Sequence, residues 1–347
     1  KRKTVMDAKD LDTLWQASQI RVTDELAMAP EVLFCNGSVI GTLGNFSAST
    51  GKAKSKKTFN VSAIVAAALT NGECLGYSAE FPDDKRTVLY FDTEQSPYHC
   101  QKVIRRAIEL AGLPTDRHPD NLFFSQLRAQ VPDTRLEIIN RGIAATPNVG
   151  LVVIDGIRDL MFDINNATES SRLINKLMEW TDNNQIHIHT VLHLNKSDDN
   201  VRGHVGTELN NKAETVLQVS KSTTDDEVTE VSASCIRAMD FSPFAFRIND
   251  NGLPEIADGY TFNRQKPQTF SYNELTSDQH RAALEKAFAN GAIKGCQNCE
   301  DGLKQAYASC GFPFGDGKVT KLKTFLMNKR MIVRENGAYA YNPDFYY

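Results

Sequence analysis

The chain has 347 residues, of which 41% are hydrophobic and 24% are charged, a composition typical of globular proteins. Its formal net charge of -4 excludes a generally basic protein, so binding to nucleic acid would have to come from local basic patches. No apolar run approaches the roughly 20 residues that cross a bilayer, and the first residues lack the apolar core of a signal peptide. We therefore expect a cytoplasmic protein with no membrane partner, and the length predicts about two domains.

The seven cysteines are scattered along the chain. Cys296 and Cys299 form a C-x-x-C, but neither a second such pair nor a histidine pair stands at the spacing of a zinc site. A chain of this length needs no disulfide bonds to fold. We interpret the cysteines as reduced thiols, which agrees with the cytoplasmic expectation.

Short apolar runs alternate with segments of helical period from about Val39 to Phe246. This alternation predicts an α/β fold with a mainly parallel sheet covered by helices on both faces. After Lys212 the helices disappear and only strand patterns remain, so the sheet should finish with late antiparallel strands. The expected strands of the parallel part are 38–46, 86–94, 121–127, 149–156 and 186–194, and the expected helices are 58–72, 97–112, 133–146 and 167–184.

The composition shifts again at 254–275, which is rich in Pro, Gln, Thr and Asn and which we interpret as a linker. Beyond it, three helical segments precede two short strands around Asn336-Gly337, a strong hairpin signal. Three helices and a hairpin predict a small winged-helix-like domain. The predicted parts are an N-terminal extension (1–34), a core (35–253), the linker (254–275) and the C-terminal domain (276–347).

The segment GNFSASTGKAKSKKTFNVSAIVAAAL, residues 44–69, joins a strand, a lysine-rich loop and a helix. A phosphate-binding P-loop has the pattern G-x-x-x-x-G-K-[ST]. In one register, Gly51, Lys57 and Thr58 fill the first glycine, the lysine and the hydroxyl, while Lys56 stands at the second glycine. The rival register joins Gly44 to 51–52, but it separates the glycines by six residues and has no hydroxyl residue at its end.

We favour the first register because Thr58 supplies a ligand for Mg²⁺ and because residues 57–58 then begin a helix, where free N–H groups attract anions. Lys57 is the residue expected on the β- and γ-phosphates. With backbone angles near those of a helix, Lys56 could point outward without strain. The residues expected to contact the nucleotide are Gly51, Lys52, Ala53, Lys54, Ser55, Lys56, Lys57, Thr58 and Phe59.

Polar residues at the ends of three later strands could complete this site, because ligands bind at the carboxyl edge of open α/β sheets. Asp155 ends the apolar strand VGLVVIDG and is the expected second ligand of Mg²⁺. Glu94, at the end of LYFDTE, is the candidate for orienting or deprotonating the attacking water, ahead of Asp92. His193, in VLHLNK, could sense the γ-phosphate. Lys196 and Arg202 follow in a polar loop that could contact DNA or a neighbouring subunit.

With these motifs in this order, residues 35–250 resemble a RecA-type P-loop ATPase core, and are most similar to the RepA/DnaB group of hexameric helicases from plasmids and mobile elements. The resemblance rests on the loop at 51–58, the glutamate in YFDTEQS, the strand LVVID, and HLNK with the loop that follows it. Lys56, a short N-terminal stretch and the winged-helix-like tail depart from that group.

The resemblance implies an ATPase that uses ATP and Mg²⁺, assembles as a hexamer and acts on single-stranded DNA. It also implies a finger residue from a neighbouring subunit, and SCIRAMDFSP partly matches that pattern with Arg237 at the arginine. A winged helix places a helix in the major groove of duplex DNA, and 318–330 carries the lysines for such contacts. The leading hypothesis is a ring-forming replicative helicase of a mobile element. The alternatives are a RecA/RadA-like recombination or regulatory ATPase that does not unwind DNA, and a DNA-binding scaffold that does not hydrolyse ATP.

Overall fold

The computed structural model describes residues 8–194, 203–262, 271–335 and 337–345. The chain divides into two compact units, Lys1–Thr261 and Phe262–Tyr347, which we describe separately. In the described residues, no helix combines the length and apolar character that crossing a bilayer requires.

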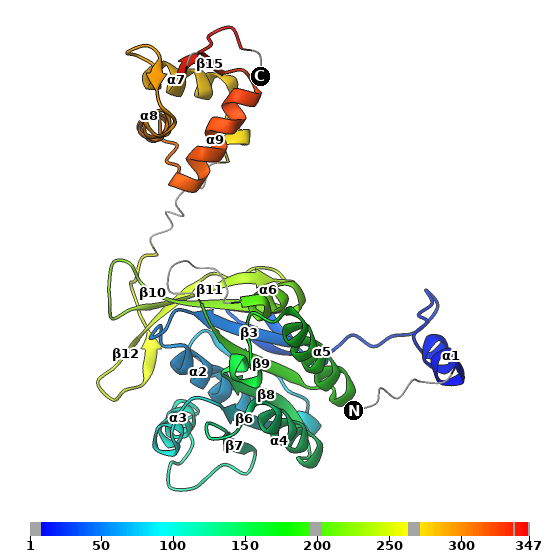
Figure 1. Ribbon diagram of the computed structural model, residues 1–347. Helices are drawn as coiled ribbons and strands as arrows, with labels where there is room; N and C mark the ends of the chain where they lie inside the picture. The colour runs from blue at the N-terminus through cyan, green and yellow to red at the C-terminus, as the bar shows by residue number, and fades with distance from the viewer. Residues whose placement is uncertain (1–7, 195–202, 263–270, 336, 346–347) are drawn as a thin grey trace. The chain divides into compact units, whose positions relative to one another are not determined.

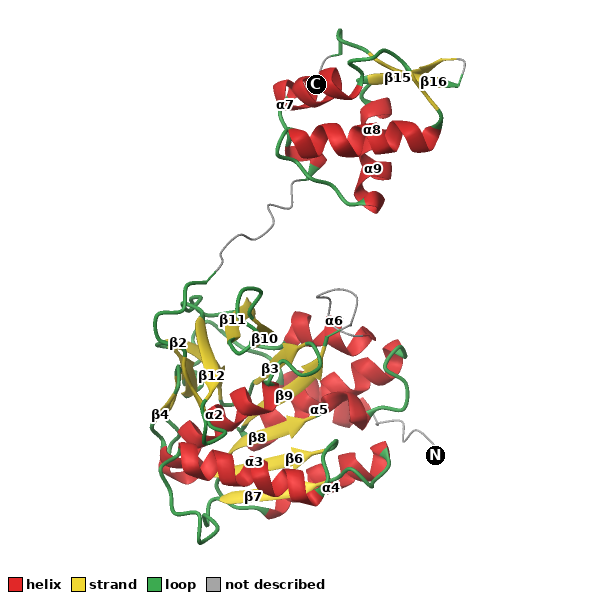
Figure 2. Cartoon of the chain, turned by 90° about the vertical axis from the view of Figure 1, so that its left-hand side faces the viewer, coloured by secondary structure: helices red, strands yellow, loops and turns green. Residues whose placement is uncertain are grey.

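The first unit is built on a nine-stranded sheet with the order β13-β12-β11-β10-β3-β9-β8-β6-β7. Six neighbouring strands, from β10 to β7, run parallel to one another, and several of them lie side by side in Figure 2. The last three strands pair antiparallel, as the helix-free pattern after residue 212 predicted. The strands are β3 (Phe46–Gly51), β6 (Thr87–Asp92), β7 (Leu122–Gln126), β8 (Val149–Asp155), β9 (His187–His193), β10 (Thr215–Lys221), β11 (Thr229–Ile236), β12 (Phe244–Ile248) and β13 (Pro254–Ile256).

Helices cover both faces of this sheet (Figure 1). Strand β8 shows why: Leu151 and Val153 pack into the core under α2 and α3, while Val152 and Ile154 pack into the core under α4, α5 and α6. An apolar run without alternation is the expected sequence of a strand buried on both faces. The helices are α2 (Lys57–Thr70), α3 (Pro97–Leu110), α4 (Pro132–Ala145), α5 (Ala167–Asn184) and α6 (Gly203–Lys212), with 3₁₀ turns η1 (Asp83–Lys85) and η2 (Ile157–Leu160).

The strand expected at 38–46 is in fact two strands in two sheets. Residues 38–42 form β2 in a small antiparallel sheet, and β3 begins only at Phe46. The chain turns between them at Gly44, whose φ of +82° lies in the left-handed region that favours glycine. The small sheet has the order β2-β1-β5-β4 and consists of β1 (Glu31–Cys35), β2 (Ser38–Thr42), β4 (Glu73–Cys74) and β5 (Tyr77–Ala79); helix α1 (Ala8–Ala17) precedes it.

The second unit contains the three helices and the hairpin expected for the tail, together with a short third strand. Its sheet has the order β14-β16-β15, and its assignment to the winged-helix class stays a prediction. A capping box, in which Thr276 and Gln279 exchange side-chain and backbone hydrogen bonds, begins its first helix. The elements are η3 (Tyr272–Glu274), α7 (Ser277–Ala287), β14 (Ile293–Lys294), α8 (Cys296–Ser309), α9 (Asp316–Asn328), β15 (Ile332–Glu335) and β16 (Ala338–Tyr341).

A buried polar network ties β3 to β9 in the first unit. His189 is fully buried, with Nδ1 2.8 Å from Ser47 Oγ and Nε2 2.8 Å from Ser49 Oγ. His187 Nε2 lies 2.7 Å from the same Ser47 Oγ. Burial, assisted by the neighbouring His187, lowers the pKa of His189 from 6.5 to about 3, so this ring is neutral in the folded protein at neutral pH.

The network makes stability depend on pH. His189 becomes protonated below about pH 6.5 in the unfolded chain, but only below about pH 3 in the folded protein. Its contribution to stability is therefore complete above pH 6.5 and is lost as pH falls through that window, with a slope of about 1.4 kcal/mol per pH unit per proton. Urea titrations should show a shallower fall in the free energy of unfolding for His189→Gln than for wild type.

His204, an exposed residue at the start of α6, offers the matched control. His204→Gln should reproduce the wild-type pH dependence. Parallel profiles for wild type and His189→Gln would contradict the assignment.

Candidate functional site

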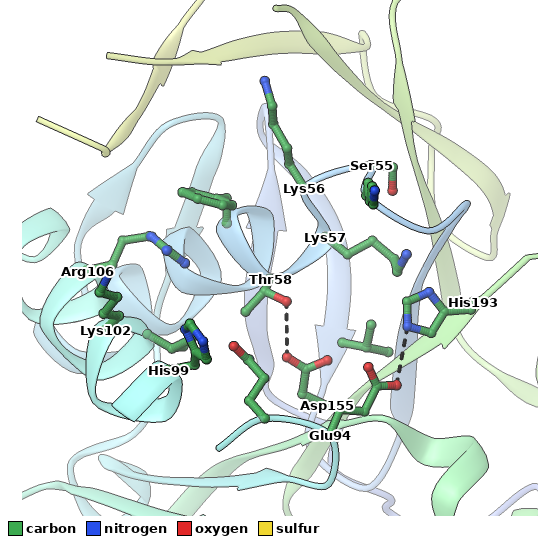
Figure 3. A pocket seen from close by; sticks show the side chains of 15 residues that line it. Ser55, Lys56, Lys57, Thr58, Glu94, His99, Lys102, Arg106, Asp155 and His193 are labelled. Atoms are coloured by element: carbon green, nitrogen blue, oxygen red, sulfur yellow. Dashed lines mark hydrogen bonds and ion pairs between the residues drawn. The ribbon is translucent and has the colours of Figure 1, made fainter. Parts of the chain in front are cut away.

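The carboxyl ends of β3, β6, β8 and β9 meet at one edge of the sheet, and a pocket of about 260 Å³ opens there. Figure 3 shows that its side chains come from the 51–58 loop, from the ends of strands and from α3. The pocket is lined by Lys54, Ser55, Lys56, Lys57, Thr58, Phe59, Glu94, Gln95, His99, Lys102, Val103, Arg106, Asp155, Val191 and His193.

The loop between β3 and α2 starts at Gly51, and only glycine fits there. A Cβ at this position would lie 2.1 Å from the backbone oxygen of Val219 in β10 and 2.6 Å from Ser55 Oγ. Gly44, the first glycine of the rival register, lies at the other end of β3, where its N–H donates to Ile186 O. One strand therefore separates the two glycines, and they cannot belong to a single phosphate loop.

Lys56 does not have the near-helical backbone that would let its side chain point outward without strain. Its φ of 63° and ψ of 28° are left-handed, as is Lys54 with φ of 65°. Such a conformation costs a non-glycine residue of order 1–3 kcal/mol. Lys56 therefore stands at the second glycine position of the P-loop pattern in a backbone conformation that favours glycine. The side chain points away from the pocket (Figure 3) and donates from Nζ to Glu227 O at 2.6 Å. The mouth of α2 is therefore not plugged by Lys56.

Lys57 begins α2 and is 5% exposed. Its Nζ donates to Gly51 O at 2.8 Å and to Lys52 O at 2.9 Å, across the loop. Burial lowers its pKa to about 8, while Asp155 and Glu94 act in the opposite direction. An anion bound beside this amine would favour its charged form, so the site is electrostatically suited to a phosphate.

Thr58 and Asp155 meet at the centre of the pocket. Thr58 Oγ1 donates to Asp155 Oδ2 at 3.3 Å, and Tyr90 OH donates to the same oxygen at 2.8 Å. Burial, and then the charge of Asp92, raise the pKa of Asp155 to about 6. A carboxylate and a hydroxyl are oxygen ligands of the kind Mg²⁺ takes, with substrate phosphates and water completing its shell. The described residues contain no cluster of three or more His, Cys, Asp or Glu side chains that could hold a metal without such help.

Glu94 and His193 form a pair on the other side of Asp155. His193 Nε2 lies 3.3 Å from Glu94 Oε1. Hydrogen bonding to His193 lowers the pKa of Glu94, against the opposing effect of burial, so Glu94 is a carboxylate at neutral pH. His193 Nδ1 is buried and has no hydrogen-bond partner among the described residues, which leaves it available to a ligand.

Asp92, the other candidate for handling water, is committed to a structural role. It is fully buried, and its Oδ1 accepts from the N–H groups of Glu94 and Gln95 while its Oδ2 accepts from Gln95 Nε2. These bonds close the turn that leads into α3. The structure therefore distinguishes Asp92 from Glu94, which projects into the pocket.

The sequence analysis did not predict the wall of the pocket that α3 forms. His99, Lys102 and Arg106 lie on one side of α3, and Arg106 lies over the Phe59 ring at 3.5 Å from its centroid. Burial lowers the pKa of Arg106, and its Nε has no hydrogen-bond partner in the described part of the chain. A guanidinium with an unsatisfied donor adds positive charge to this wall of the pocket. The spacing of three basic residues after Pro97 was the available signal.

Arg237 lies away from the pocket of its own chain. Arg237 directly follows β11, whose last residue pairs with Thr215 at the start of β10. This is the amino edge of the parallel strands, opposite the pocket. Arg237 Nη2 donates there to Lys212 O at 3.1 Å. Lys196 and Arg202 lie outside the described residues.

Comparison with known proteins gives one family match. Residues 36–199 match a family model described as an AAA domain. The matched segment contains the loop at 51–58 and the strand ends that carry Glu94, Asp155 and His193. The chain matches no curated protein. The match covers just under half of the chain, and it makes residues 36–199 similar to AAA domains, which are P-loop ATPases.

Proposed function

We propose that this chain is an ATP-dependent motor acting on DNA, and that it is a ring-forming replicative helicase or helicase-like protein of a mobile element. The observation that carries the ATPase part is the arrangement of Lys57, Thr58 and Asp155 at the mouth of α2. The AAA domain match supports the same class of reaction.

The residues of the pocket divide the work of phosphoryl transfer between them. In the first turn of α2, the N–H groups of Phe59 and Asn60 donate to Lys56 O. The N–H groups of Lys57 and Thr58, which have no partner within the helix, and the Lys57 ammonium bind the β- and γ-phosphates. Thr58 and Asp155 are the residues that would hold Mg²⁺, which when bound neutralises charge on the phosphate oxygens. Glu94 orients a water molecule and takes its proton, with His193 beside it. Arg106 and Lys102 offer further positive charge along the α3 wall.

The site is proposed to be completed by a neighbouring copy of the chain. Arg237 lies at the opposite edge of the sheet from the pocket of its own chain, so it can serve only the pocket of another subunit. An arginine supplied in trans contributes about 10³ to 10⁵ in rate in related phosphoryl transfers. A ring, proposed as a hexamer, would bring each Arg237 to its neighbour's ATP.

The contact with DNA is assigned to two regions. Lys196 and Arg202 are proposed to meet single-stranded DNA or an adjacent subunit, and α9 of the second unit is proposed to meet duplex DNA. Lys318 and Lys321 on α9 and Lys329 directly after it are exposed, but Lys323 is only 8% exposed. Its ammonium pairs with Glu300 and with Cys296 of α8, so the basic surface of α9 is smaller than its sequence suggests.

Substitution of Lys57 tests the nucleotide site and its register. Lys57→Ala should lose ATP binding and turnover because it removes the buried ammonium. Lys52→Ala should retain most of both, because Lys52 is exposed and does not line the pocket. Binding of a fluorescent ATP analogue and release of phosphate are the measurements. The reverse outcome would contradict the assignment of Lys57 to the phosphates.

Glu94→Gln separates binding from hydrolysis. It keeps the shape of the side chain and removes the base, so the analogue should bind as in wild type while turnover falls by about 10² or more. Persistent turnover would move the role of handling water to another residue.

The DNA-dependent part is tested by phosphate release with and without single-stranded DNA, on protein whose mass is measured by light scattering. The proposal predicts a ring, stimulation by DNA and displacement of a paired strand. Stimulation without strand displacement would favour a RecA/RadA-like ATPase. Absence of hydrolysis under all conditions would leave a DNA-binding scaffold and contradict the motor.

A further inference from the structure

The turn between β10 and β11, residues 222–228, approaches the phosphate loop although more than 160 residues separate them in sequence. One contact joins the loop to β10, and a second joins it to the turn. Gly51 packs so closely on β10 that a Cβ would lie 2.1 Å from Val219 O. Lys56 Nζ donates to Glu227 O at 2.6 Å. The loop is therefore held against this hairpin at both its beginning and its end.

The turn presents Glu227 O from a well-braced backbone. Ser222 Oγ accepts from the N–H groups of Thr224 and Asp225, and Asp225 Oδ1 accepts from Glu227 N–H. The ends of the turn close through Ser222 N–H donating to Val228 O. A carbonyl held in this way is a fixed acceptor rather than part of a freely moving loop.

The surroundings of Lys56 act on its charge in both directions. Burial is the largest cause that lowers the pKa of Lys56, and the charge of Lys221 acts in the same direction. The charges of Glu227 and Asp225 raise this pKa. The acidic side chains thus partly offset the burial of the ammonium. No such partners hold Lys54, whose side chain is exposed and makes no hydrogen bond or ion pair within the described ranges.

We propose that Lys56 is a positioning residue that clamps the phosphate loop onto the β10–β11 turn through its hydrogen bond to Glu227 O. The clamp holds residue 56 in the left-handed conformation, which sets the direction of the N–H groups of Lys57 and Thr58 at the start of α2. The hydrogen bond of the lysine side chain thus stabilises a backbone conformation that a glycine adopts without help. This inference rests on the proposed function, because the loop that it positions is the proposed ATP site.

Three substitutions of Lys56 test the clamp by the KM for ATP and by kcat. Lys56→Met removes the donor and should raise KM about tenfold, the size expected for one hydrogen bond from a charged donor. The effect should fall on KM more than on kcat, because the loop binds the phosphates throughout the reaction. Lys56→Arg should restore most of the affinity. Lys56→Gly suits the left-handed backbone but lacks the anchor, so its KM should also rise.

Lys54→Met is the matched control, since it removes one positive charge from the same loop at another left-handed residue. It lowers affinity only through lost charge, so its KM should rise less than that of Lys56→Met. Equal effects in both variants, or ATP binding by Lys56→Gly as tight as in wild type, would overturn the clamp.

Amide hydrogen exchange in the nucleotide-free protein tests the clamp independently of ATP turnover. In Lys56→Met, amides of 222–228 and 52–57 should exchange faster than in wild type, while Lys54→Met leaves 222–228 unchanged. Unchanged exchange of 222–228 in Lys56→Met would refute the clamp. If exchange rises but wild type neither binds nor hydrolyses ATP, the clamp stands and the proposed function fails.

Discussion

The hydrogen bond from Thr58 Oγ1 to Asp155 Oδ2 is the contact on which the rest of the site depends. It joins the first turn of α2 to the end of β8, two segments that approach each other only because β3 and β8 flank β9 in one parallel sheet. In such a sheet all strands end at the same edge, so Glu94 and His193 arrive beside Asp155 from β6 and β9. The fold thus concentrates carboxylates and a buried amine where a helix begins.

Burial shifts the pKa values of three groups in the pocket against their charged forms. Lys57 and Arg106 both have pKa values lowered by burial, and Asp155 has one raised by burial. Each group is therefore less stable in its charged form than it would be in water. A nucleotide triphosphate would favour the two cations, and Mg²⁺ would favour the carboxylate. Shifted pKa values gathered in one pocket are typical of a binding site.

The parts of the fold that depend on hydrophobic pattern were predictable. The run VGLVVIDG gave β8 with Asp155 at its end, and the loss of helices after residue 212 gave the antiparallel strands. The break at Gly44 was not predicted, because a single glycine between apolar residues also fits a continuous strand. Strand polarity and order placed Asp155 and Glu94 at one edge, which the sequence already indicated.

Features that depend on tertiary contacts were not predictable from the sequence. Lys56 is left-handed and its side chain donates to Glu227 O, a partner distant in the chain. Burial of Lys323 depends on the packing of α9 on α8, where Glu300 meets it. The sequence also did not show that Asp92 accepts hydrogen bonds within its own turn. Nor did it show which side of α3 faces the pocket, because that depends on how the helix is rotated.

A crystal structure of the chain with Mg²⁺ and a non-hydrolysable ATP analogue would test the central claim most directly. The account predicts phosphates against the first turn of α2, Lys57 released from the Gly51 and Lys52 carbonyls onto them, and the cation between Thr58 and Asp155. An analogue bound away from α2, or a Lys56 side chain swung into the mouth of the loop, would contradict it.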